Sequence, residues 1–494
     1  MISAMLPWIA TGSALHLTSF ILVCLYCLRH RKHPSSTILW MFLTWSFPVL
    51  GVAFFVVFGV DRVTVRANSK LQQNNNLRDA RNNTAADALP LAYWRAMKDL
   101  QPNMDGAGMN RVNRAIDTFA PDFPLLSGNN IAPLIGGTEA YPAMLHAIRE
   151  ATDHIHFQCF IIRNDPISRT VFDAMVDRAK QGIHVRILFD RFGSTQAILT
   201  GFFLRYRNIP NFEIHGWTQV NLFKRRLQIN LRNHRKTLII DGKTAFFGGI
   251  NLDQVNLPGK KTEAHRDYHF CANGPIVQQL QYAFLQDWFF MTNEPPQTLL
   301  KDQFFPTNAA AGTTPARIVP SGPAAEDYAI EDMFFLLTGE ACEQILIVTP
   351  YFVPSPALVA ALRAAALRGV DVHLILPEHN NHFYAGWAAR AFYHELLQAG
   401  VRIFLRRPPF IHAKAVLVDA RIMTVGTANW DLRSLRLNYE TNLLVYDENL
   451  AGRLKQVMLE DEAMSQEIHL AGWEARPQWH RLLENACALL APIL

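Results

Sequence analysis

The chain has 494 residues, of which 50% are hydrophobic and 18% charged, so it is long enough for two large lobes and too apolar to be disordered throughout. Its formal net charge of +5 and pI near 8.8 favour contact with anionic phospholipid head groups but are too mild to indicate a nucleic-acid partner. The slightly positive mean hydropathy of +0.03 agrees with a membrane-associated protein.

Two long uncharged stretches begin the chain. Residues 1–28 and 34–60 contain no Lys, Arg, Asp or Glu, and each exceeds the roughly 20 residues that cross a bilayer as a helix. The sequence therefore predicts two transmembrane helices, or a tight membrane hairpin, in residues 1–61. A cleaved signal peptide is disfavoured because no basic residue precedes the first stretch, no A-x-A site follows it, and a second stretch comes at once.

Basic residues on both sides of the second stretch leave its orientation open. Residues 29–33 (RHRKH) favour a cytoplasmic loop between the spans, which would export the rest of the chain. The basic residues that follow the second span favour the opposite orientation: Arg62, Arg66, Lys70 and Arg78.

The rest of the chain divides into an extension and two lobes. Residues 62–127 are expected to form a polar tether and N-terminal extension, because residues 72–84 are rich in Gln and Asn. Two β-α-β series follow, in a first lobe at 128–305 and a second at 317–494, separated by a Pro- and Ala-rich linker at 306–316. This alternation predicts an α/β fold with parallel-rich sheets covered by helices. The expected elements are helix 143–152, strand 155–162, helix 167–180, strand 185–189, strand 345–348, helix 356–367 and strand 372–376.

One motif occurs once in each lobe. Its pattern, H-x-K-x4-D-x6-G-[GT]-x-N, starts at His234 and again at His412. A short apolar run after each Lys predicts a buried strand, and residues two apart on a strand share a face, so each His points the same way as its Lys. A purely structural repeat would leave an unpaired Lys in a β-rich core, which is costly. The motif residues are His234, Lys236, Asp241, Gly248, Gly249 and Asn251, then His412, Lys414, Asp419, Gly426, Thr427 and Asn429.

Two histidines from two similar halves can face one another across a shared cleft, and such a pair suits covalent transfer of a phosphoryl-type group without a metal. The small residues allow close backbone approach, and the two Asn are neutral donors for a phosphate oxygen. We expect no metal and no cofactor, because the six cysteines show no zinc spacing and no Gly-rich phosphate loop is present. The DG-x2-AR signature of transferases that use CDP-lipids is also missing, since Asp241-Gly242 continues as KTAF.

The doubled motif resembles the phospholipase D superfamily, and its flanks are similar to the bacterial cardiolipin synthases. The similarity runs from about Gly128 to the end and includes the hydrophobic start. The chain departs from the family at residues 265–269 (HRDYH), where a Trp usually precedes Arg-Asp, and at residues 252–254 (LDQ). The supporting segments are residues 232–236 (RNHRK), 320–323 (PSGP), 349–354 (TPYFVP), 368–372 (RGVDV), 426–434 (GTANWDLRS) and 437–440 (LNYE).

The resemblance implies two similar phospholipase D-like lobes, each with a mixed sheet flanked by helices, around one active site, in a multi-pass protein of the bacterial inner membrane. It implies transfer of a phosphatidyl group from one phosphatidylglycerol to another, giving cardiolipin and glycerol, with His234 as nucleophile and His412 as acid and base. Lys236, Lys414, Asn251 and Asn429 would neutralise the phosphate oxygens. Asp267 and Glu440 are each expected to hold a histidine Nδ1–H. Asp241 and Asp419 belong to the catalytic motif, although their distance along the chain from the histidines favours support of a loop.

Two other functions stay open. A phospholipase D that hydrolyses membrane phospholipids would use the same histidines and release phosphatidic acid, and a non-catalytic membrane scaffold would not need both motifs complete. Residues 479–494 are expected to form an ordinary helix packed on the second lobe rather than a lipid contact. Further co-substrates and the oligomeric state are not determined by the sequence.

Overall fold

The structure is a computed structural model that describes residues 2–29, 34–59, 63–82, 102, 107–217, 231–259, 262–306, 310–323 and 328–489. It contains two compact units, Met1–Arg66 and Ala67–Leu494. In the first unit, helices pack on one another around Val23, Cys27 and Phe55. Its elements are α1 (Ile2–Arg29), α2 (Pro34–Ser46), α3 (Pro48–Phe54) and the π-helical turn η1 (Phe55–Gly59).

The second uncharged stretch is not one continuous helix. α2 has 13 residues and ends at Ser46, and α3 begins at Pro48 after Phe47 takes φ −129° and ψ 81°. Proline lacks a backbone N–H and disfavours a helical conformation in the residue before it, which explains the break. Within the described ranges, none of the helices is both long enough and apolar enough to span a membrane. The prediction of two transmembrane helices therefore has no support from the described residues.

α4 (Val63–Asn82) occupies most of the segment predicted to be a flexible tether, and this prediction is wrong for the described part of it. The helix is held because its few large side chains find partners in the second unit. Lys70 forms a buried ion pair with Asp287, Leu77 is fully buried, and Arg81 lies 2.6 Å from Asp122. Residues 83 and 84, the end of the predicted tether, lie outside the described residues.

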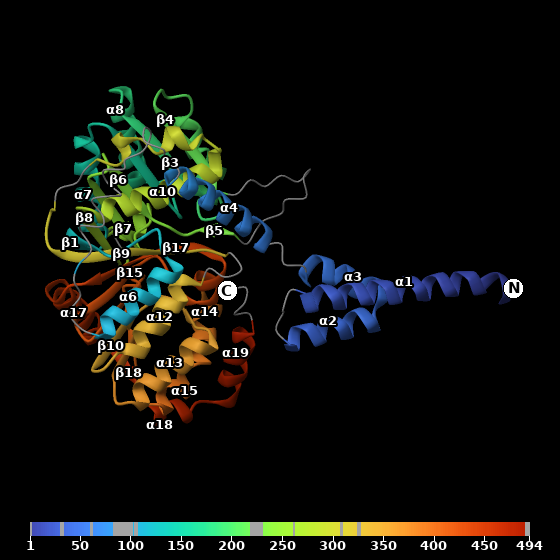
Figure 1. Ribbon diagram of the computed structural model, residues 1–494. Helices are drawn as coiled ribbons and strands as arrows, with labels where there is room; N and C mark the ends of the chain where they lie inside the picture. The colour runs from blue at the N-terminus through green and yellow to red at the C-terminus, as the bar shows by residue number, and fades with distance from the viewer. Residues whose placement is uncertain are drawn as a thin grey trace. The chain divides into compact units, whose positions relative to one another are not determined.

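The second unit is built on a mixed β-sheet whose two halves repeat one strand order (Figure 1). One half runs β1-β8-β7-β6-β2-β3-β4, the other runs β9-β17-β15-β14-β10-β12-β13-β18, and antiparallel pairing of β1 with β9 joins them. The strands are β1 (Leu126–Ile135), β2 (His154–Cys159), β3 (His184–Asp190), β4 (Phe212–Trp217), β5 (Arg232–Asn233), β6 (Thr237–Ile240), β7 (Thr244–Gly248), β8 (Tyr268–Asn273), β9 (Thr314–Ser321), β10 (Gln344–Val348), β11 (Phe352–Val353), β12 (Asp371–Pro377), β13 (Arg402–Arg406), β14 (Ala415–Val418), β15 (Ile422–Gly426), β16 (Trp430–Asp431), β17 (Asn438–Tyr446) and β18 (Ser465–Ile468).

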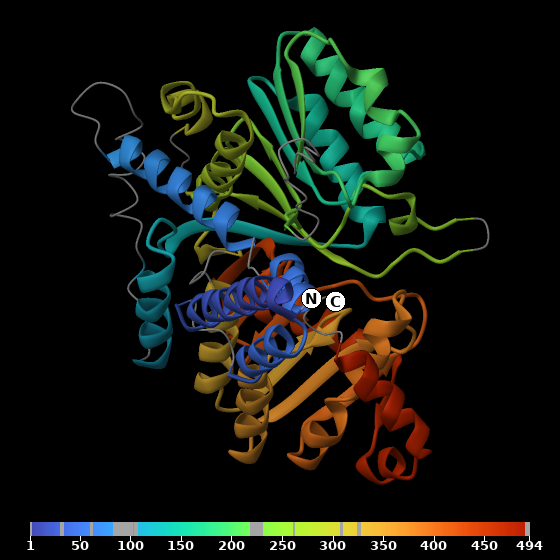
Figure 2. The same cartoon turned by 90° about the vertical axis from the view of Figure 1, so that its right-hand side faces the viewer.

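Helices cover both faces of each half of the sheet (Figure 2). On β6, Leu238 and Ile240 pack against α7 and α8, while Ile239 packs toward α10. On β14, Val416 and Leu417 divide between the two faces in the same way. The remaining helices are α6 (Ala107–Phe119), α7 (Gly137–Glu150), α8 (Pro166–Lys180), α9 (Thr195–Leu199), η2 (Phe202–Tyr206), η4 (Gln254–Asn256), α10 (Ile276–Thr292), α11 (Pro296–Leu299), η5 (Asp302–Phe304), α12 (Ala329–Glu340), α13 (Pro356–Leu367), α14 (Phe383–Arg390), α15 (Tyr393–Gln398), α16 (Leu432–Arg436), α17 (Glu448–Ala463), α18 (Leu470–Glu474) and α19 (Gln478–Ala488).

Local sequence explains the repeated unit. α8 begins after Asp165, whose carboxylate accepts from the Ser168 N–H, and α13 begins after Ser355, whose hydroxyl caps in the same way. A proline follows each cap at the first helical position, where its missing N–H costs nothing. The predicted α/β alternation is thus confirmed. The sheet is mixed, as the family resemblance implied and the β-α-β alternation alone did not, because β6, β7 and β8 pair antiparallel, as do β14, β15 and β17.

The structure can be compared with two further predictions, the linker at residues 306–316 and the helix in residues 479–494. Residues 314–316, placed in the linker, belong to strand β9. The helix expected in residues 479–494 is present as α19, which packs on α14, while residues 490–494 lie outside the described residues.

Candidate active site

Each motif histidine is held by backbone pairing with the opposite half of the sheet. β5, just before His234, pairs parallel with β17 of the other half, and the His234 N–H donates to the Tyr439 carbonyl at 2.9 Å. The segment before His412 pairs with Arg266 of the first half, and the His412 N–H donates to the Arg266 carbonyl at 2.7 Å. The two motifs therefore meet where the halves join.

A carboxylate from the opposite half contacts each imidazole. His234 Nδ1 lies 2.9 Å from Glu440 Oε2, and His412 Nδ1 lies 2.7 Å from Asp267 Oδ2. Both carboxylates are fully buried, whereas His412 keeps 15% of its side chain exposed. A carboxylate at Nδ1 orients the ring and stabilises the tautomer whose Nε2 lone pair is available. The structure places Asp267 and Glu440 where the sequence predicted and adds that each pair joins the two halves.

The small motif residues make room for these carboxylates. A side chain at Gly249 would overlap the Asp267 carboxylate, and one at Gly248 or Gly426 would overlap the backbone of the neighbouring strand. In the second motif the corresponding position is Thr427, whose hydroxyl donates to Glu440 Oε2 at 2.6 Å. These residues therefore support the carboxylates.

Both motif lysines are buried beside the histidines. Lys236 Nζ donates to the His234 carbonyl at 2.6 Å, and Lys414 Nζ donates to the His412 carbonyl. Burial lowers the pKa of Lys236 to about 8 and the pKa of Lys414 to about 7. An anion bound between them would favour their charged forms, so the two ammonium groups are suited to a phosphate.

The surroundings of both imidazoles favour their neutral forms. Burial lowers the pKa of His234, and Glu440 opposes that shift. Burial and then Lys414 lower the pKa of His412 to about 3, although Asp267 acts in the opposite direction. A neutral imidazole can attack phosphorus, whereas protonation of the second imidazole requires added negative charge in the cleft.

The two motif asparagines differ in their contacts. Asn251 Oδ1 accepts from the Ile161 N–H at 3.0 Å, which fixes the orientation of the amide. Asn429 Nδ2 donates to Ser434 Oγ at 3.1 Å, and Asn429 Oδ1 is buried without a hydrogen-bond partner among the described residues. The Ser434 hydroxyl itself donates to Asp431 Oδ2 at 3.3 Å, so it accepts from Asn429, and this fixes the orientation of the Asn429 amide.

Asp241 and Asp419 support turns, as their distance from the histidines favoured, although they were grouped with the catalytic residues of the motif. Asp241 follows β6 at the end opposite His234 and takes φ 54°, and Asp419 follows β14 with φ 51°. Their carboxylates accept backbone N–H groups at the start of β2 and β10. The donors to Asp241 are Thr152, Asp153 and His154, and the donors to Asp419 are Cys342, Glu343 and Gln344. The motif acid holds a turn against the neighbouring strand.

A buried charge cluster behind His234 was not predicted. Asp287 on α10 lies 2.8 Å from Arg235 NH1 and 2.9 Å from Lys70 Nζ, and it also accepts from Asn233 Nδ2 at 2.9 Å. Arg235 Nε in turn donates to the Glu440 carbonyl. Asp287 therefore fixes the residues on both sides of His234. The signal available in the sequence was a lone acidic residue in an otherwise uncharged, largely apolar helix.

Aromatic rings complete the walls of the site. The Phe160 ring lies 4.7 Å from the His234 ring, and the Tyr351 ring lies 6.5 Å from the His412 ring, both edge to face. His265 and His269, at the departure from the family pattern, lie on either side of Asp267 in the chain. Burial lowers the pKa of His269 to about 4, so this imidazole is neutral. Within the described residues no cluster of three or more His, Cys, Asp or Glu side chains has a metal-binding arrangement.

Comparison with known proteins agrees with this geometry. The chain matches the family model described as "Cardiolipin synthase, PLD-like domain" over residues 144–288 and 337–461. It is 31% identical over 482 residues to "Cardiolipin synthase 2" of Bacillus anthracis, covering 97% of this chain and 90% of the relative. It is 31% identical over 492 residues to "Major cardiolipin synthase ClsA" of Bacillus subtilis (strain 168), covering 98% of each. The crystal structure of phosphatidylserine synthase from Haemophilus influenzae Rd KW20 matches with a TM-score of 0.59 at 16% identity, over 78% of this chain and 100% of that one, which shows a shared fold.

Proposed function

We infer the chemistry of this chain from the premise that it belongs to the cardiolipin synthase family of phospholipase D-like proteins. It is a phosphatidyltransferase that makes cardiolipin. The observation that carries the mechanism proposed below is the pair of imidazoles, one from each half, each with a buried carboxylate of the opposite half at Nδ1. This arrangement leaves two Nε2 atoms for chemistry on one phosphodiester.

In the first step His234 Nε2 attacks the phosphorus of a phosphatidylglycerol. A bond forms between nitrogen and phosphorus, the bond from phosphorus to the glycerol oxygen breaks, and protonated His412 gives its proton to the leaving glycerol. The product is a phosphatidyl group on His234. Burial, and then the Lys414 charge, depress the pKa of the His412 imidazole, and the negative charge of the substrate acts against both, which favours protonation of His412.

In the second step the hydroxyl of another phosphatidylglycerol attacks the same phosphorus. Neutral His412 takes the hydroxyl proton, the bond to His234 breaks, and cardiolipin leaves. Lys236 and Lys414 face the phosphate oxygens and stabilise the charge that develops on them in both transition states. Water competes with the lipid alcohol at this step, and a phospholipase D hydrolase would be the outcome if water prevailed.

Association with a lipid surface is supported by the first unit. Its helices carry many large apolar side chains that are exposed, as expected of a surface that meets acyl chains rather than water. Those that are more than half exposed include Leu15, Leu22, Leu25, Leu28, Ile38, Leu39, Phe42, Trp45, Val49, Leu50 and Phe54. We propose that residues 1–61 hold the enzyme at the bacterial inner membrane, where both lipid substrates are concentrated, and that residues 128–305 and 317–494 form the two lobes.

The test uses His234→Ala and His412→Ala, with His184→Ala as the control because His184 is an exposed histidine at the start of β3. The products made from defined phosphatidylglycerol vesicles are measured by mass spectrometry. The control should form cardiolipin and glycerol, and neither site variant should. Phosphatidic acid as the sole product of the wild type would assign a hydrolase, and substantial turnover by either site variant would refute the two-histidine mechanism.

A second experiment tests which histidine attacks. Intact-protein mass spectrometry after acid-free quenching, followed by peptide mapping, locates the phosphatidyl group. His412→Ala retains the proposed nucleophile and should accumulate a trace of adduct, whereas His234→Ala should trap none. An adduct on the peptide that contains His412, and not on the one that contains His234, would reverse the two roles.

A further inference from the structure

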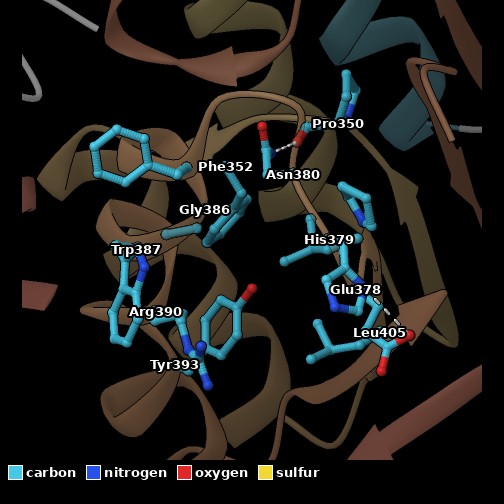
Figure 3. A pocket seen from close by; sticks show the side chains of 14 residues that line it. Pro350, Phe352, Glu378, His379, Asn380, Gly386, Trp387, Arg390, Tyr393 and Leu405 are labelled. Atoms are coloured by element: carbon cyan, nitrogen blue, oxygen red, sulfur yellow. Dashed lines mark hydrogen bonds and ion pairs between the residues drawn. The ribbon is translucent and has the colours of Figure 1, made fainter. Parts of the chain in front are cut away.

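A cavity of about 400 Å³ lies in the second half of the sheet, beside the active site (Figure 3). It opens at the carboxyl ends of the parallel strands β12 and β13 and is closed on the other side by α14 and α15. In α/β sheets this edge is where ligands commonly bind, and the volume is in the range of small-molecule sites. None of the residues placed in the reaction above lines it.

The lining combines apolar and polar side chains. Phe352, Leu376, Trp387 and Leu405 form an apolar part of the wall, and Glu378, His379, Asn380 and Arg390 also line the cavity. Tyr393 is 3% exposed, and its hydroxyl faces the cavity in Figure 3, where it can donate to a ligand. The cavity therefore suits an amphipathic ligand whose apolar part lies against the first four residues and which offers an oxygen acceptor to Tyr393.

The mouth of the cavity has the composition of a lipid-facing surface. Phe383 lines the cavity and is 71% exposed. The Trp387 ring lies 6.3 Å from the Trp479 ring on α19, where Leu482 is also exposed. Aromatic and aliphatic side chains grouped on a surface are typical of contact with a membrane, where tryptophan prefers the head-group level.

Charged groups surround this apolar mouth. The Arg390 guanidinium stacks over Trp387 at 5.0 Å, and its Nε lies 3.6 Å from Glu484, a carboxylate that also pairs with Arg476. On the opposite wall the His379 ring lies 3.6 Å from Glu378. Two arginines thus share one buried carboxylate on one side of the cavity, and the Glu378 carboxylate lies on the other.

One residue separates the cavity from the reacting histidine. Pro350 and Phe352 line the cavity, whereas the side chain between them, Tyr351, has its ring 6.5 Å from the His412 ring. The Tyr351 hydroxyl donates to Asn381, and Asn380 donates to the Pro350 carbonyl at 2.7 Å, so the loop that bounds the cavity is tied to this segment. A lipid whose phosphate lies at His412 can therefore place a chain across Tyr351.

We propose that this cavity binds one acyl chain of the phospholipid that reacts at His412, with the Tyr393 hydroxyl donating to the ester carbonyl of that chain. The proposal rests on the proposed function, because it assigns the cavity to a substrate of that reaction. It adds a binding site and a residue that recognises the ester group.

The direct test is photolabelling. Full-length protein in phosphatidylcholine vesicles receives phosphatidylglycerol with a diazirine at the end of one acyl chain, and labelled peptides are mapped after illumination. We expect labelling in residues 376–405, and loss of that labelling in Leu405→Trp and Ala389→Leu, which fill the cavity. Leu367→Trp is the matched control, since it adds the same side chain on the exposed face of α13 in the same half. Labelling elsewhere, or unchanged labelling in the filled variants, would overturn the proposal.

Kinetics give an independent measurement that does not depend on the filled variants folding. Tyr393→Phe removes only the hydroxyl and should raise KM for dioleoyl phosphatidylglycerol about threefold to tenfold with kcat unchanged, while KM for the short dihexanoyl lipid stays constant. Equal effects on both lipids, or no effect on either, would contradict acyl-chain recognition. If the wild type forms no cardiolipin yet residues 376–405 are labelled, the proposed function fails and the lipid site stands. If cardiolipin forms but residues 376–405 are not labelled, the proposed function stands and the acyl-chain site is refuted.

Discussion

Replacing Asp287 by asparagine removes a buried carboxylate that lies between two buried cations. The ammonium of Lys70 lies 2.9 Å from Oδ1 and the guanidinium of Arg235 lies 2.8 Å from Oδ2. Removing one partner of a buried pair costs about 3–5 kcal/mol, because the remaining charge loses its counter-ion and cannot be rehydrated. Asparagine keeps one oxygen acceptor, so we expect the lower end, about 3 kcal/mol of unfolding free energy. Activity should fall as well, since Arg235 and the asparagine before His234 lose a shared partner.

A variant with both Asp287 and Lys70 replaced distinguishes the loss of charge pairing from the loss of side-chain packing. Lys70→Met removes one cation at similar volume, so Asp287→Asn combined with Lys70→Met should be more stable than Asp287→Asn alone by about 1–2 kcal/mol. The unfolding free energies are measured by equilibrium unfolding in urea, followed by tryptophan fluorescence, because Trp288 is buried next to residue 287. The comparison requires the slope m to be the same in all variants. Asp302→Asn is the control at an exposed carboxylate. Asp287→Asn within about 1 kcal/mol of that control, or strictly additive losses in the double variant, would refute the reasoning.

The same cluster predicts the direction of an acid effect. Burial by itself would raise the pKa of Asp287, but Arg235 and Lys70 hold it well below its usual range. A carboxyl group with a depressed folded-state pKa stabilises the protein above its unfolded-state pKa, about 3.9 for Asp, and that stabilisation is lost as pH falls below this value. The wild type should therefore lose more unfolding free energy between pH 5 and pH 2 than Asp287→Asn does.

Further predictions concern the reaction. Glu440→Gln should lower kcat about 10²- to 10⁴-fold with little change in lipid binding, because the histidine loses its orienting anion, and full activity would exclude that role. Asp419→Asn should lower the unfolding midpoint while leaving kcat/KM within about twofold, since its carboxylate contacts backbone N–H groups and not the reacting atoms. The pKa of Lys414 near 7 and of Lys236 near 8 require kcat/KM to fall as pH rises through that range, because the free enzyme loses the charges that bind phosphate. A constant kcat/KM between pH 6 and 9 would count against this. EDTA should leave the chemical step intact, and recovery by one specific divalent ion, with lipid packing controlled, would show a metal site.

Local patterns were sufficient to predict the repeated α/β architecture and the histidine-lysine pairs. Side-chain alternation along a strand places His234 beside Lys236 and His412 beside Lys414, whatever the strand packs against. The predicted helices 167–180 and 356–367 correspond to α8 (Pro166–Lys180) and α13 (Pro356–Leu367). The break between α2 and α3 was also encoded locally, in the proline at position 48, but the absence of charge in the stretch outweighed it in our interpretation.

Amino-acid composition gave a wrong prediction for the segment before residue 84, because burial of its side chains depends on residues that are distant in the sequence. The Gln- and Asn-rich segment looked like a tether, yet Lys70 and Leu77 are buried against residues far along the chain, and this packing makes α4 a helix. For Asp241, the distance from the histidine was enough to favour support of a loop. The structure adds which groups are held, namely backbone N–H groups at the start of β2.

The sequence by itself determined the reacting groups of this protein, because their chemistry and their common strand face follow from residue type and a two-residue period. Only the tertiary structure decided which carboxylate serves which histidine. His234 and Glu440 are 206 positions apart, and His412 and Asp267 are 145 apart. Each pair forms because a short segment of one half hydrogen-bonds to a strand of the other. Such long-range pairing depends on the packing of the whole sheet, which no local periodicity specifies.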